Sequence, residues 1–203
     1  MTQNLSPVSQ AAEPGMPLTQ PVQQEYFVEN LFSLAIIQKQ TSTRITMDLH
    51  YNQLNTEEMP SIVNLLEENL PSVLATICYN DKNLPFNEEV QNTEIGHLFE
   101  HILLEYLCQH KMAKGAKRAT YAGKTKWNWH RDPMGRFHIH LNCGKKDADI
   151  LPLALDQTVS LMKVLLSHNQ QPLFLTETSE PANGLKNGQG GLPFRSLDEG
   201  GCE

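Results

Sequence analysis

The chain has 203 residues, with 16 Lys and Arg against 23 Asp and Glu, a net charge of −7 and four cysteines. This length fits one domain with tails or two very small domains, and the negative charge argues against a general nucleic-acid binder. No apolar run approaches the roughly 20 residues that span a bilayer, and the N-terminus has no secretory-signal pattern. The cysteines have no paired spacing, so we expect reduced thiols in a cytoplasmic protein and no cysteine-based zinc site.

Composition predicts that both ends of the chain are disordered. Residues 1–25 are rich in Gln, Pro and Ser, and residues 170–203 hold six of the twelve glycines. Such segments cannot bury enough apolar surface to offset the entropy cost of ordering. Residues 26–42 are expected to form a docking segment, in which apolar side chains at helical spacing over 26–38 predict a short helix that docks on the domain or binds a partner. The domain itself is expected over residues 43–169.

Strand and helix patterns alternate within the domain. In chain order, the predicted elements are a strand at 44–51, a helix at 55–70, a short strand or a helical continuation at 74–79, a loop at 80–92, a helix at 93–110, a hairpin with strands at 119–129 and 136–142, and a helix from Asp147 or Asp149 to about 167. This order predicts an α+β fold, a two-layer sandwich in which helices cover one face of a small mixed or antiparallel sheet.

The helix predicted at 93–110 concentrates polar side chains on one face. Placed at helical steps, two histidines and three glutamates fall on one face, opposite an apolar face that would pack on the sheet. The pattern His97, Glu100, His101 is His-x-x-Glu-His, the inverted zincin motif. The other interpretation is a solvated face of an amphipathic surface helix.

A zinc site on this face would use the two imidazoles one turn apart as ligands. Glu100, just before the second histidine, would then take a proton from water beside the metal. Glu105 lies on the same face and is predicted to be the third ligand or to hydrogen-bond His101. Four further residues are alternatives for the third ligand: Asp149, Asp156, His138 and His140.

Residues 93–105, Thr-Glu-Ile-Gly-His-Leu-Phe-Glu-His-Ile-Leu-Leu-Glu, resemble the N-terminal domain of cyanophycin synthetases. The basic stretch at 121–126, the strand at 136–141 and the closing helix at 151–166 extend the resemblance over about 45–168. The resemblance implies an isolated N-domain. In some of these synthetases that domain is thought to hold a zinc peptidase-like centre that trims the Asp–Arg polymer, and in others it only holds the polymer. Because this sequence has no Gly-rich phosphate-binding loop, we expect no synthetase activity from it.

Seven Lys and Arg, and no Asp or Glu, lie between residues 111 and 131. Four residues of this stretch are the candidates for binding the polymer: Arg118, Lys124, Lys126 and Trp127. Cations would meet the carboxylates of the polymer, and the helix carboxylates would meet its guanidinium groups. The stretch also fits a solvated hairpin with inward aromatic side chains, or a single-strand nucleic-acid site. A basic strip beside an acidic patch suits a zwitterionic polymer better than nucleic acid.

The sequence therefore predicts a zinc-dependent, peptidase-like domain that acts on a cyanophycin-like polymer of Asp and Arg. His97, His101 and Glu105 are the predicted zinc ligands, and Glu100 is the predicted catalytic base. A non-catalytic module that binds the polymer, or docks on a cyanophycin synthetase, is the alternative. A single-strand nucleic-acid binder is a third interpretation, and no membrane partner is expected.

Overall fold

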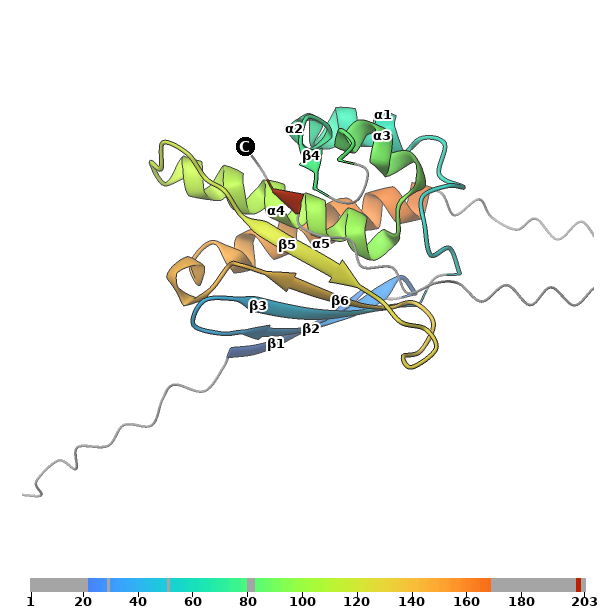
Figure 1. The fold of residues 1–203 in the computed structure, drawn as a ribbon, viewed down its shortest axis with the longest axis horizontal. Coiled ribbons are helices and arrows are strands. Elements are labelled where there is room, and N and C mark those ends of the chain that lie inside the picture. The colour runs from blue at the N-terminus through green and yellow to red at the C-terminus, as the bar shows by residue number, and fades with distance from the viewer. Residues whose placement is uncertain (1–21, 29, 51, 80–82, 169–199, 202–203) are drawn as a thin grey trace, which may run out of the picture.

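A computed structural model describes residues 22–28, 30–50, 52–79, 83–168 and 200–201 (Figure 1). Apart from residues 22–25 and 200–201, the segments predicted to be disordered lie outside this range. Within it, one sheet has the strand order β1-β2-β3-β6-β5-β7-β4, and all of its pairings are antiparallel. The strands are β1 (Val22–Val28), β2 (Phe32–Gln38), β3 (Thr43–Leu49), β4 (Ile77–Cys78), β5 (Ala122–Lys126), β6 (Arg136–Leu141) and β7 (Gly200–Gly201).

Helices cover one face of this sheet, with α4 packed across β5 and β6 and with α5 beside α4 (Figure 1). The helices are α1 (Ile62–Asn69), α2 (Pro71–Leu74), α3 (Phe86–Glu89), α4 (Ile95–Ala113) and α5 (Leu151–His168), with 3-10 turns η1 (Val90–Asn92) and η2 (Lys145–Asp147). The α+β prediction is confirmed. The shared core places Phe99 and Ile102 of α4 and Phe137 of β6 out of contact with solvent.

The helix predicted over residues 26–38 is wrong, because this segment forms the β1–β2 hairpin. Its apolar residues happen to fit helical spacing, but the burial in β2 alternates with period two, the spacing at which a strand returns to the same face. Phe32, Leu34 and Ile36 are buried against the core, whereas Phe27 and Ile37 are exposed. The intervening turn places Asn30 at a φ of 59°.

The second half of the domain follows the sequence prediction more closely. The predicted hairpin forms from β5 and β6, and Gly135 precedes β6 with a φ of 85° that favours glycine. The predicted short strand at 74–79 contains β4. The loop predicted at 80–92 includes α3 and η1, and the helix predicted at 55–70 begins only at Ile62. Among the described helices, none is long and apolar enough to cross a membrane.

Candidate metal centre

Helix α4 is buried on its polar side as well as on its apolar side. His97, Glu100, His101 and Glu105 are each at most 6 % exposed. The apolar side packs on the sheet, while α2, α3 and β4 lie on the other side of α4 (Figure 1). There Phe86 of α3 stacks on His101, and Cys78 of β4 approaches His97. The solvated-face interpretation is therefore wrong. Burying four ionisable side chains is costly unless each is held by specific partners, so their surroundings point to a site.

His97 is held at both ring nitrogens. Its Nδ1 lies 2.7 Å from the hydroxyl oxygen of Thr93, one turn earlier, and its Nε2 lies 3.4 Å from the sulfur of Cys78. The Thr93 backbone N–H donates to the hydroxyl oxygen of Thr56, which fixes Thr93 in place. This network orients the imidazole so that Nε2 faces the thiol.

His101 is held by stacking. Its ring lies on that of Phe86 with centroids 3.9 Å apart and planes 15° from parallel, and its centroid is 4.7 Å from that of His97. Its Nε2 atom is buried and has no hydrogen-bond partner among the described residues. An unsatisfied buried nitrogen costs about 1–3 kcal/mol, and a bound ligand at this atom would offset that cost.

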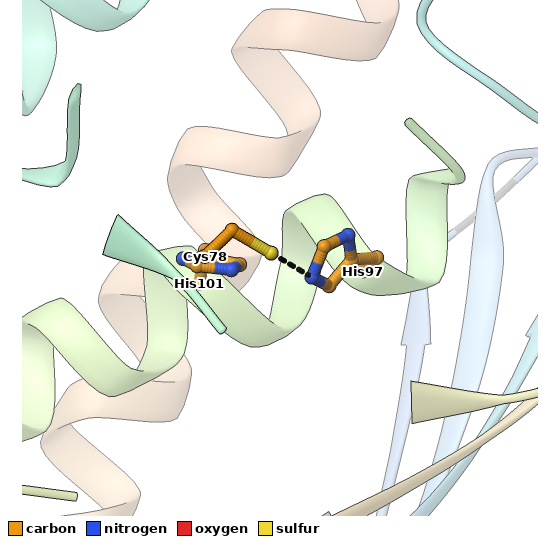
Figure 2. A group of neighbouring side chains, drawn as sticks. All are labelled: Cys78, His97 and His101. Atoms are coloured by element: carbon orange, nitrogen blue, oxygen red, sulfur yellow. Dashed lines mark hydrogen bonds between the residues drawn. The ribbon is translucent and has the colours of Figure 1, made fainter. Parts of the chain in front are cut away.

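Cys78 of β4 completes a group of three. One ligand atom each from Cys78, His97 and His101 lies within 4.8 Å of the other two, and all three residues are buried (Figure 2). Figure 2 shows the sulfur of Cys78 pointing toward the ring of His97. Donors this close to one another can bind a single ion, because zinc–sulfur and zinc–nitrogen bonds are about 2.3 and 2.0–2.1 Å long.

Both imidazoles are neutral at ordinary pH. Burial lowers the pKa of His97 to about 4. Burial, and the proximity of His97, hold the pKa of His101 well below its usual value. Neutral imidazoles carry the lone pair that a metal requires.

The donor set fits zinc. Thiolate and imidazole are its usual protein ligands, and a site with three protein ligands leaves a fourth position for a substrate. The unpartnered Nε2 of His101 is the observation that supports such occupancy. A hydrogen bond between Thr93 and Nδ1 of His97 is also the outer contact expected of a metal-binding histidine.

Glu100 points away from the Cys78–His97–His101 group, toward β5. Its carboxylate accepts a hydrogen bond from the hydroxyl of Thr125, and its other oxygen lies against Gly123, where no side chain intervenes. Glu100 is therefore not one of the clustered donors. It borders β5 on the sheet side of the helix.

Glu105 also lies outside the clustered donors. It accepts a hydrogen bond from Gln109 and lines an open cleft of about 800 Å³ with Ile77, Arg118 and Lys117. The third residue that the structure groups with the two histidines is Cys78, and Glu105 lines the same cleft as Arg118, one of the predicted polymer-binding residues.

The other predicted polymer-binding residues are separated from this cleft. Gly123 and Thr125 face α4, so Lys124 and Lys126 lie on the opposite face of the sheet. Trp127 is 8 % exposed and packs against Phe137 and Trp129 in the core.

The four alternative third ligands do not join the cluster. Asp149 pairs with Lys114, Asp156 accepts from Tyr26, His138 pairs with Asp132, and His140 lies opposite Arg44 and Lys124 on the sheet.

Sequence reasoning missed Cys78, Phe86 and Thr93. Cys78 lies 19 residues before His97, on a separate two-residue strand. The position of Thr93 four residues before His97 was a usable signal, because residues at that spacing meet on consecutive helical turns. The expectation of reduced cysteines holds for the thiols of Cys78 and Cys143, whereas Cys108 is disulfide-bonded.

The model of a family described as cyanophycin synthase-like N-terminal domain matches residues 44–148. No curated protein and no solved structure matches. The matched segment begins in β3 and ends just before α5, so it contains α4 and all three clustered donors.

Proposed function

The chain belongs to the family of cyanophycin synthase-like N-terminal domains, which suggests a cyanophycin-related role. Within that role, we propose that the protein is a zinc-dependent peptidase of a cyanophycin-like Asp–Arg polymer. The observation that carries the proposal is the buried group of Cys78, His97 and His101, with the Nε2 of His101 unpartnered among the described residues. Three converging donors in a water-poor site are more than the packing of a helix requires.

His97, His101 and Cys78 would hold the metal, and zinc bound there would polarise a peptide carbonyl. Thr93 keeps the His97 ring oriented, and Phe86 keeps the His101 ring from rotating away. Glu100 would act as general base from the β5 side of a substrate, with the Thr125 hydroxyl fixing its carboxylate. Arg118 and Glu105 in the neighbouring cleft offer one charge of each sign to a zwitterionic polymer.

The first test measures zinc in the purified full chain by elemental analysis. We expect about one zinc ion per chain, and a loss of zinc in the His97→Ala/His101→Ala double variant. The control is His50→Ala, which removes an exposed histidine near Ser33. Stoichiometric zinc in the double variant would contradict the site.

The second test measures the chain length of an Asp–Arg polymer after incubation with protein. Wild type should shorten the polymer, and Glu100→Gln should do so at least about 10²-fold more slowly, which is the scale for loss of a general base. Glutamine keeps an acceptor for Thr125, so the fold and the zinc content should not change. Equal cleavage by both proteins would remove Glu100 from the mechanism.

The alternative is a module that binds the polymer without cleaving it, which the mixed charges of the cleft favour. It predicts an unchanged polymer with both proteins, and binding that weakens in Arg118→Ala. For a single-strand nucleic-acid site, the buried Trp127 offers no open ring face on which bases could stack.

A further inference from the structure

The two residues of β7 fill a position between β4 and β5. Gly200 pairs with Cys78 on one side and with Gly123 on the other, and Gly201 pairs with Ile77 and Ala122. Figure 1 shows β7 as a short red arrow beside α4, far in the sequence from both of its neighbours. Through β7 the small strand β4 joins the main sheet.

Two strand edges therefore face each other across the width of one strand. Neighbouring strands lie about 4.7–4.9 Å apart, so edges on either side of a strand are separated by roughly 10 Å. An extended backbone inserted there can form main-chain hydrogen bonds on both sides. Addition of a strand to exposed edges is a common mode of peptide recognition, with affinity supplied by the main chain.

The floor of this slot is α4, which contacts β7. The wall at Cys78 belongs to the group of clustered donors, and the wall at Gly123 adjoins the carboxylate of Glu100. A backbone at the position of Gly200 therefore lies between the residues that carry the site's chemistry. Any peptide bound in the same way would pass through the same place.

We propose that the slot between β4 and β5 is a binding site for an extended peptide backbone, and that the chain's own Gly200–Gly201 segment occupies it as an internal competitor. A peptide ligand must displace β7 to pair with Cys78 and Gly123. The inference does not depend on zinc or on hydrolysis, because strand addition needs only the two edges.

The test compares the full-length wild type with the full-length double variant Gly200→Pro/Gly201→Pro. Proline has no N–H and cannot donate to a strand ladder, so the variant removes both donors of β7. The probe is a fluorescent peptide of residues 196–203 in which Ser replaces Cys202, and a scrambled peptide is the control. Reducing agent is present, because Cys108 is disulfide-bonded.

The variant should bind the probe at least 10-fold more tightly than wild type, and neither protein should bind the scrambled peptide. Hydrogen exchange at Ile77 and Gly123, which lie opposite β7, should be faster in the variant and slow again when the probe is added. The amides of Cys78 and Ala122 donate to Leu84 and to the Asn142 side chain, so their exchange is the internal control. Unchanged exchange in α4 and α5 shows that the variant is folded. If the double variant does not fold, the single variant Gly200→Pro is used in its place. Equal binding to both proteins, no binding to the variant, or exchange at Ile77 and Gly123 that the prolines do not alter would overturn the proposal. Zinc content does not enter either readout.

Discussion

At the scale of single residues, Cys78 and Glu105 are the two candidates for the third ligand of the proposed zinc site. The Cys78 sulfur lies 3.4 Å from Nε2 of His97, whereas Glu105 is engaged with Gln109 at the edge of the cleft. Cys78→Ser should therefore lower zinc affinity by more than the roughly 10–100-fold that loss of an outer contact costs. Glu105→Gln should change the affinity by less than about 10-fold. Competition with a chromogenic chelator measures both, and the reverse order of effects would restore Glu105 as the ligand.

The buried imidazoles make the metal-free protein sensitive to acid. The pKa of His97 is lowered to about 4 by burial, whereas the unfolded value is about 6.5. Well above pH 6.5 the His97 imidazole is neutral in both the folded and the unfolded protein. As the pH falls toward 4, the imidazole is protonated first in the unfolded protein, so the free energy of unfolding falls. The loss from His97 is roughly 3 kcal/mol by pH 4.

Urea unfolding of the metal-free protein between pH 7 and pH 4 measures this loss. Carboxylates also titrate in this range, so the quantity to compare is the pH slope of wild type against that of His97→Asn, which lacks the ionisable group. His50→Asn, at an exposed position, should keep the wild-type slope. Identical slopes for wild type and His97→Asn would contradict the burial of a neutral imidazole.

Part of the site could be predicted from the sequence because it depends on local spacing. His97 and His101 lie one turn apart on any helix, so their proximity follows from helical geometry. Cys78 and Phe86 reach the same point through a change of chain direction that no local pattern encodes. The direction of the Glu100 carboxylate is not set by local spacing either, because Thr125 and Gly123 on β5 decide where it points.

At the scale of elements, the close contact between α4 and β5 requires a glycine at position 123. A Cβ atom at Gly123 would lie 2.5 Å from Oε1 of Glu100 and 2.9 Å from Cδ2 of Leu141. The carboxylate cannot swing aside easily, because Thr125 holds it. Gly123→Ala should destabilise the domain by about 1–3 kcal/mol, the usual cost of overpacking.

Thermal and denaturant unfolding check this expectation. Lys124→Ala, at the next position and on the opposite face of β5, is the matched control and should change stability little. If Gly123→Ala were as stable as wild type, α4 would have to sit farther from β5 than the structure places it.

The success of prediction also differed between elements for physical reasons. The hairpin of β5 and β6 was predictable because turn residues at 132–135 separate two runs with strand patterns. The segment at 26–38 was not, because its apolar spacing fits both periods and only pairing with β3 decides between them. The short α3 has four residues and follows Pro85, so its helical form depends on packing rather than on intrinsic propensity.

Asp147 joins three parts of the chain at the scale of the whole molecule. Its side chain is fully buried in η2, just before α5, and one oxygen accepts from the Lys111 ammonium at 2.7 Å and from the Tyr121 hydroxyl at 2.9 Å. Lys111 lies in the last turns of α4, and Tyr121 directly precedes β5. The hydrogen bond that Lys111 donates to Asp147, together with the negative charge of that carboxylate, raises the pKa of Lys111, and burial raises the pKa of Tyr121.

Removing this carboxylate should loosen the junction of α4, β5 and α5 together. Asp147→Ala leaves the buried Tyr121 hydroxyl without its acceptor and ends the ion pair with Lys111, so we expect a loss of about 2–4 kcal/mol in the free energy of unfolding. Asp147→Asn keeps an oxygen acceptor and should lose less. The matched control is Asp149→Ala, because the Lys114–Asp149 pair has side chains 47 % and 65 % exposed, so water screens it and its loss should change stability little. Denaturant unfolding at pH 7 ranks the three variants, and an Asp149→Ala loss equal to that of Asp147→Ala would show that the junction is not held by the buried carboxylate.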